Sequence, residues 1–243
     1  MYSFNIAIAN HVIQICTAYP LSSDMFEDYL STGVADMRVN ITKEELLIEP
    51  KERSKDETEK SDQKNSSCAP NLLSRVADCL AESNTILFHG ASICVNDSVF
   101  IFSAPSGTGK TTHILKWLDN IQEAFAINGD KPFIITYENG NSPIVCGSPW
   151  AGKENLYTNC SAKLESIIFM QRSEINSIQQ ISFSEAFPFL LQQTYRPKEL
   201  DKMRKVISSI KRLSGKVKFF HFYCNNYKDD CFQVAYNSLV QKA

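Results

Sequence analysis

The chain has 243 residues, 43% of them hydrophobic and 21% charged, which suffices for one sizeable core or for one domain with a small appendage. A net charge of −2 gives no electrostatic footprint for nucleic acid or for an anionic membrane. No apolar run reaches the ~18 residues that span a bilayer, and the first residues lack the basic and apolar regions of a signal peptide, so a cytoplasmic protein is expected.

Eight cysteines are scattered along the chain, and no two of them form a CxxC pair. Metal sites usually show short paired spacings, and a chain of this size needs no disulfide staples. We therefore expect reduced cysteines that pack as small hydrophobic side chains.

Residues 1–48 predict a small β-rich N-terminal unit. Its strands are expected over Phe4–Ile8, Val12–Thr17, Met37–Ile41 and Leu46–Ile48, with a short helix over Ser23–Leu30 between them. Residues 49–70 then crowd charges of both signs, serine and asparagine, with hardly an apolar side chain among them. Such a segment buries too little surface to offset its ordering entropy, so a flexible charged linker is predicted there.

Residues 71–243 are predicted to form the second domain, which carries the chemistry. Its first elements are expected to be a helix over Asn71–Ser83, strands over Thr85–Val95 and Val99–Ala104 joined by a tight turn at Asn96–Asp97, and a helix over Thr111–Leu118. The second of these strands runs directly into a glycine-rich loop that opens the following helix.

That loop reads Ala104-Pro105-Ser106-Gly107-Thr108-Gly109-Lys110-Thr111, which is a phosphate-loop pattern with alanine in place of its first glycine. Glycines permit backbone angles that turn successive N–H groups toward phosphate oxygens, and the helix N-terminus adds a favourable dipole. Lys110 is placed for the β- and γ-phosphates, and the Thr111 hydroxyl for magnesium. The expected nucleotide-binding residues are Ser106, Gly107, Thr108, Gly109, Lys110, Thr111 and Thr112. A chance glycine-rich turn is the alternative, against which the flanking strand and helix argue.

The elements after the loop are short strands joined by turns rather than repeated strand–helix units. Strands are expected over Ala124–Asn128, Pro132–Tyr137, Ser142–Cys146, Leu164–Gln171, Ser177–Ser182 and Val217–Tyr223, and helices over Ser184–Gln193, Lys198–Leu213 and Asp229–Val240. The second and third of these strands, and likewise the fourth and fifth, are predicted to form hairpins. The fold class is therefore α/β with a mixed, largely antiparallel sheet, which argues against a GTPase or an ATPase motor.

From about residue 85 to 197 the chain resembles the HPr kinase/phosphorylase-like family, which shares a nucleotide-binding core with phosphoenolpyruvate carboxykinase. The resemblance rests on Phe88-His89-Gly90, the loop through His113, Asn128-Gly129-Asp130, Gly147 to Glu154, Glu174-Ile175-Asn176 and Leu191–Tyr195. It implies a kinase fold in which an acidic residue after the loop's helix activates an acceptor hydroxyl. HPr kinases phosphorylate a protein serine, and relatives in peptide-maturation pathways act on precursor peptides.

The chain also departs from that family. HPr kinase has two adjacent aspartates where this chain has Gly129-Asp130, and Gly152-Lys153-Glu154 stands near the place of its Gly-Arg-Asn signature. Phosphorylase activity and HPr as the substrate are therefore not expected.

Asp130 is the first choice for the general base or for a magnesium ligand beside Thr111, with a simple turn aspartate as the alternative. His89 could contact phosphate or acceptor, or could be a satisfied core histidine. Lys153 could neutralise the transferring phosphoryl group and Glu154 could hold magnesium or the acceptor, although both could be solvated loop residues.

The expected protein is an ATP-dependent and magnesium-dependent kinase that transfers the γ-phosphoryl group to a hydroxyl. The acceptor is expected to be a serine of a peptide or protein in a maturation pathway, with the N-terminal unit docking a peptide strand. The alternatives are a nucleotide-binding regulatory or scaffold protein with degraded catalysis, and a small-molecule kinase. No nucleic-acid or membrane partner is expected, and a homo-oligomer is compatible with the sequence.

Overall fold

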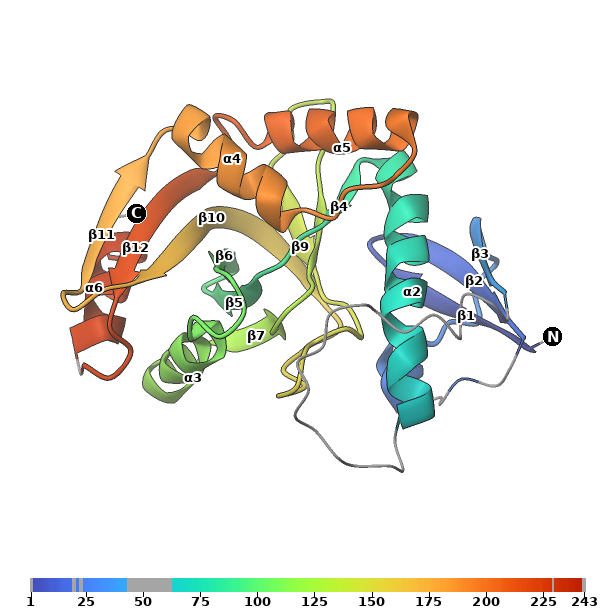
Figure 1. Cartoon of the computed structure of the whole chain (residues 1–243), viewed down its shortest axis with the longest axis horizontal. Coiled ribbons are helices and arrows are strands. Elements are labelled where there is room, and N and C mark those ends of the chain that lie inside the picture. Colours follow the sequence, from blue (N-terminus) through green and yellow to red (C-terminus); the bar gives the residue numbers. More distant parts are fainter. Residues whose placement is uncertain (1, 19–20, 22–23, 43–62, 229, 242–243) are drawn as a thin grey trace.

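The computed structural model describes residues 2–18, 21, 24–42, 63–228 and 230–241. A three-stranded sheet lies at one end of the molecule, beside a long helix, and a larger curved sheet fills the rest (Figure 1). The chain thus forms a mixed α/β fold, as the sequence predicts.

The small sheet has the order β1-β2-β3. Its strands are β1 (Tyr2–Ile8), β2 (His11–Thr17) and β3 (Met37–Ile41). The first two strands pair antiparallel and the last two pair in parallel. The predicted helix Ser23–Leu30 is instead a short 3-10 helix, η1 (Asp24–Tyr29). The predicted strand Leu46–Ile48 lies outside the described residues.

Helix α2 (Gln63–Leu80) begins earlier than the helix predicted over Asn71–Ser83, and a 3-10 turn, η2 (Ala81–Ser83), follows it. The final part of the predicted linker 49–70 is therefore helical, although its polar composition and Pro70 give no helical signal. The rest of that predicted linker lies outside the described residues. The predicted domain boundaries stay a prediction, but the small sheet, α2 and part of the large sheet share one hydrophobic core.

The large sheet has the path β4-β8-β9-β10-β6-β5-β7, with β12 bound to β10 and β11 bound to β12. Its strands are β4 (Thr85–Leu87), β5 (Ala91–Val95), β6 (Ser98–Ser103), β7 (Phe125–Asn128), β8 (Phe133–Ile135), β9 (Ile144–Cys146), β10 (Ser161–Arg172), β11 (Ser177–Ile181) and β12 (Lys218–Cys224). Among the described pairings, β10 is parallel to β6 and to β12, and the others are antiparallel. The sheet is thus mixed.

The single strand predicted over Thr85–Val95 is two strands, β4 and β5, which pair with different partners. The chain leaves the sheet between them because the N–H groups of His89 and Gly90 donate to the carbonyls of Gln193 and Asp130. A Cβ on Gly90 would lie 2.6 Å from the Ile101 side chain, so the crossing needs glycine. A continuous apolar run does not reveal such a switch of partner.

The hairpin predicted from Leu164–Gln171 and Ser177–Ser182 is wrong, because β12 lies between β10 and β11. Both strands were found, but an apolar pattern specifies a strand and not its neighbour. The strand that separates them, residues 218–224, follows β11 in the chain only after helices α4 and α5.

Helices cover both faces of the large sheet. Helices α3 (Lys110–Asn120) and α6 (Asp230–Leu239) share one core cluster with it, and α4 (Phe183–Gln193) and α5 (Leu200–Arg212) share another. Figure 1 shows α4 and α5 along one side of the sheet and α3 on the other. No helix in the described part of the chain is long and apolar enough to cross a membrane.

Candidate functional site

The glycine-rich loop connects β6 with the N-terminus of α3, in the expected strand–loop–helix order. Gly107 and Gly109 have φ values of +77° and +107°, which L side chains rarely adopt. Ala104 stands where the pattern has glycine, and it is not among the described residues with a positive φ, so alanine fits there. The backbone N–H groups of the loop and the dipole of α3, which begins at its end, both favour an anion.

Lys110 is buried at the base of this loop, with 8% of its surface exposed. Its Nζ donates a hydrogen bond to the Ala104 carbonyl at 2.9 Å. Burial lowers the pKa of Lys110 and nearby Lys131 adds to that effect, while the Asp130 carboxylate opposes both. An ammonium group in such a place gains much from an anionic ligand, because burial has removed part of its hydration.

The other predicted loop residues differ in their exposure. Ser106 is exposed and Thr108 is half-buried, with its hydroxyl donating to the Pro105 carbonyl at 2.8 Å. Thr111 is half-buried and Thr112 is exposed, both in the first turn of α3. Neither threonine lies in the core of the protein.

Asp130 follows β7 and lies close to the side chains of His89 and Lys131. His89 Nε2 lies 3.3 Å from Asp130 Oδ1, and Lys131 Nζ lies 3.7 Å from the same oxygen. Burial raises the pKa of Asp130, but the hydrogen bond from His89 and the charges of Lys131 and Lys110 outweigh it, so the net shift is downward. The carboxyl group is therefore ionised at neutral pH.

The Asp130 backbone is held by the buried side chain of Asn128, which is bound in turn to the buried Ser148. Asn128 Oδ1 accepts hydrogen bonds from the N–H groups of Asp130 at 2.9 Å and Lys131 at 2.6 Å. Its Nδ2 donates to the carbonyl of Ser148 at 2.8 Å and to the hydroxyl at 3.0 Å. Sequence reasoning gave neither residue a role, although both lie in stretches that carry the family resemblance.

His89 is fixed by contacts on several sides, and its contact with phosphate or acceptor stays a prediction. Its Nδ1 lies 2.9 Å from Gln193 Oε1, at the end of α4, and its carbonyl accepts from Ser103 Oγ at 2.8 Å. Gln193 had no assigned role in the sequence analysis, because only the fold brings α4 to this place.

The space for a second aspartate is closed in this chain. A Cβ on Gly129 would lie 2.8 Å from the Ala151 carbonyl, and the Gly129 N–H donates to the Leu156 carbonyl at 2.8 Å. Any side chain at position 129 would therefore require the 151–156 segment to move. Asp130 remains the acidic residue of this turn.

Lys153 and Glu154 lie in an exposed turn that passes close to Asp130. The turn begins at Gly152, whose φ is +82° and where a Cβ would lie 3.2 Å from the Asp130 Cβ. The backbone of this turn is thus adjacent to the candidate site, and both residues are exposed. Their proposed roles stay predictions.

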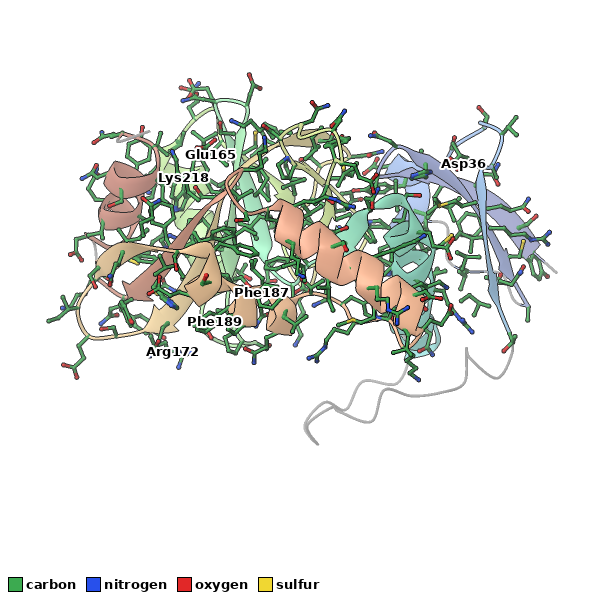
Figure 2. The ribbon with its side chains drawn as sticks, turned by 90° about the horizontal axis from the view of Figure 1, so that it is seen from above. Asp36, Glu165, Arg172, Phe187, Phe189 and Lys218 are labelled. Carbon is green, nitrogen blue, oxygen red and sulfur yellow. The ribbon has the colours of Figure 1, made fainter. Side chains whose placement is uncertain are left out.

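Two further residues contact the loop from its other side, and sequence reasoning missed both. Arg172 Nη2, at the end of β10, donates to the Gly107 carbonyl, and Asn226 Nδ2 donates to the Gly109 carbonyl at 2.9 Å. Figure 2 shows Arg172 well away from Glu165, which lies near the other end of the same strand. The parallel pairing of β10 with β6, which the sequence does not reveal, places Arg172 beside the loop.

Among the described residues, no group of three or more histidine, cysteine, aspartate or glutamate side chains could hold a metal ion. The seven cysteines described are free thiols, as expected, and Cys68 lies outside the residues whose side chains are described. Magnesium binding by Thr111 and Asp130 stays a prediction.

No known protein-family profile matches the sequence, and no curated protein matches it. Among solved structures, the HPr(Ser) kinase/phosphatase from Coxiella burnetii is similar with a TM-score of 0.39 and 10% sequence identity. The match covers 64% of this chain and 97% of that one. The structural relationship is distant, so the activity is inferred below from this chain's own residues.

Proposed function

We propose that this protein is an ATP-dependent phosphotransferase that moves the γ-phosphoryl group to a hydroxyl, most simply a serine of a peptide or protein. One observation carries the proposal: an ionised carboxylate, Asp130, is oriented by His89 and Asn128 and interacts electrostatically with the buried Lys110 of the loop. Phosphoryl transfer needs mainly positioning and charge stabilisation, and this arrangement offers both.

The residues of the loop fit a triphosphate. Gly107 has open space around its Cβ position, and Lys110 and Arg172 supply positive charge on two sides of the loop. Magnesium usually binds one or two carboxylates together with substrate phosphates and water. The Asp130 carboxylate and the Thr111 hydroxyl are the candidate magnesium ligands of this site. When bound, the ion would neutralise phosphate charge.

We assign Asp130 as the general base that takes the proton of the acceptor hydroxyl. His89 and Lys131 both face Oδ1, which leaves Oδ2 as the oxygen for the acceptor hydroxyl. A carboxylate in this position accepts the proton as the oxygen–phosphorus bond forms, and Lys110 and Lys131 stabilise charge near it. Asn128 keeps the Asp130 carboxylate in place, because its side chain accepts a hydrogen bond from the Asp130 backbone N–H.

A second function, nucleotide-dependent binding without efficient catalysis, is favoured by one specific observation. The close approach of the Ala151 carbonyl to Gly129 excludes the paired aspartates of the HPr kinase pattern. A single carboxylate would then serve both magnesium and proton transfer. Acceptor-dependent ADP formation separates the two functions, because a binding protein forms none.

The Asp130→Asn variant tests the kinase assignment. The amide keeps the shape but cannot take a proton, so we expect transfer to a peptide, protein or small-hydroxyl library to fall by about 10²–10⁴-fold while ATP still binds. Loss of magnesium-dependent affinity as well would assign Asp130 to the metal. The exposed Asp119→Asn variant on α3 is the matched control. Unchanged turnover in Asp130→Asn would remove Asp130 from the reaction.

A further inference from the structure

The carboxyl ends of three strands meet at the edge of the large sheet where the loop lies. Phe169 of β10 is paired with Ser103 at the end of β6, and Arg172 at the end of β10 is paired with Cys224 at the end of β12. Ligands of open α/β sheets bind outside the carboxyl ends of strands. The site thus extends from the loop across the ends of β10 and β12.

The loop divides this edge into two sides. His89 and Asp130 come from the turns next to β5 and β7, whereas Arg172 and Asn226 come from β10 and the turn after β12. Under the proposed function, on which this inference rests, the γ-phosphate faces Asp130. The nucleoside must then extend to the opposite side, over β10 and β12.

On that opposite side, the turn between β12 and α6 is fixed against the loop. Asn226 Nδ2 binds the Gly109 carbonyl, and a Cβ on Gly109 would lie 2.4 Å from that nitrogen. Lys116 Nζ, from α3, donates to the Lys228 carbonyl at 3.2 Å. The N–H of Asn225 donates to Asn176 Oδ1 at 2.6 Å. The turn is therefore held by the loop, by the helix that follows the loop and by the β10–β11 connection.

This fixed turn carries Tyr227, whose side chain is 97% exposed. The amide groups around it are engaged within the protein, since Asn225 Oδ1 accepts from the Tyr227 N–H at 3.1 Å and Asn226 Oδ1 accepts from Cys231 Sγ at 3.3 Å. An exposed aromatic ring on a turn that is hydrogen-bonded to the phosphate loop suits stacking on the face of a base. Stacking does not require hydrogen bonds to the base edge.

We propose that the turn Asn225–Lys228 forms the nucleoside subsite of this protein, in which the Tyr227 ring stacks on the base of the bound nucleoside triphosphate. The phosphates then lie in the loop between Arg172 and Lys110, and the γ-phosphate lies toward Asp130. The subsite contributes affinity for the nucleoside but none for the phosphate chain alone.

Calorimetric titration of the full chain with magnesium ATP and with inorganic tripolyphosphate tests this assignment. Tyr227→Ala should weaken ATP binding by between about fivefold and one-hundredfold, which is the range for loss of base–aromatic stacking, and leave tripolyphosphate binding unchanged. Tyr227→Phe keeps the ring and should bind ATP like the wild type. Tyr2→Ala, an exposed tyrosine of the small sheet, is the matched control.

The outcomes separate this inference from the proposed function. Wild-type protein that binds neither ligand would overturn both. Wild-type protein that binds both ligands, together with Tyr227→Ala that binds ATP equally well, would overturn the subsite and leave the phosphate site standing. Equal weakening of ATP and tripolyphosphate by Tyr227→Ala would also overturn it, because the ring would then act through the shape of the loop.

Discussion

At the scale of single residues, the orientation of Asp130 depends on a side chain that is itself fully buried. Asn128 makes two accepted and two donated hydrogen bonds, which uses the full capacity of its amide. The sequence Asn-Gly-Asp suggests a turn, and only the fold shows that Asn128 links β7 to Ser148. Lys110 and the glycines, by contrast, could be predicted because their pattern is local and their chemistry requires adjacent positions.

The Asn128→Ala variant tests this supporting role. Removal of the amide leaves the N–H groups of the half-buried Asp130 and Lys131 and the carbonyl of the buried Ser148 without their partner, so we expect a loss of about 1–3 kcal/mol in the free energy of unfolding. Denaturant titration measures it. Asn120→Ala removes an exposed asparagine on α3 and should change stability by less than about 0.5 kcal/mol. Equal effects of the two substitutions would show that the Asn128 network does not stabilise the turn.

At the scale of elements, local patterns predicted most strands and helices, whereas their pairing was only partly predictable. The hairpin of β5 and β6 follows from the turn at Asn96 and Asp97, both of which have positive φ, so local chemistry determines that pairing. The insertion of β12 beside β10 has no local signal, because the two strands are far apart in the chain. That insertion also places the Tyr227 turn at the site.

An ion pair joins β10 to β12. Glu165 of β10 lies 3.0 Å from Lys218 of β12 and 3.2 Å from Lys163, and Figure 2 shows Glu165 and Lys218 side by side. Burial raises the pKa of Glu165, but the hydrogen bonds from Lys218 and Lys163 outweigh it and hold the pKa below its usual range.

A lowered folded-state pKa means that ionised Glu165 stabilises the protein above its unfolded pKa of about 4.3, and that this stabilisation is lost as the pH falls through the folded pKa. We expect wild type to be more stable than Glu165→Gln at pH 7, and the difference to shrink below about pH 4.3. Denaturant titrations across this pH range measure it, and added salt should reduce it. If the stability difference between wild type and Glu165→Gln were constant with pH, the Glu165–Lys218 ion pair would not link the strands.

At the scale of the whole molecule, the site lies where several parts of the fold meet. Trp150 and Phe133, near the Asp130 turn, belong to the core that joins the small sheet and α2 to the large sheet, whereas Trp117 of α3 belongs to another. Composition allowed one sizeable core or one domain with a small appendage, but hydrophobic pattern alone gives no information about which elements share a core. The N-terminal unit is thus packed against the part of the large sheet that positions Asp130.

Calorimetric titration of magnesium ATP into wild type and Lys110→Ala most directly tests the central claim, that the 104–111 loop binds a nucleoside triphosphate. We expect wild type to bind and the variant to lose about tenfold to one-hundredfold in affinity, as a charge-assisted contact to phosphate is removed. Lys110→Ala also removes the hydrogen bond to the buried Ala104 carbonyl, so its unfolding temperature is measured alongside to establish that the variant is folded. Lys211→Ala, which changes an exposed lysine of α5, should bind normally. Equal affinity of wild type and Lys110→Ala, or no binding by the folded wild type, would contradict the account.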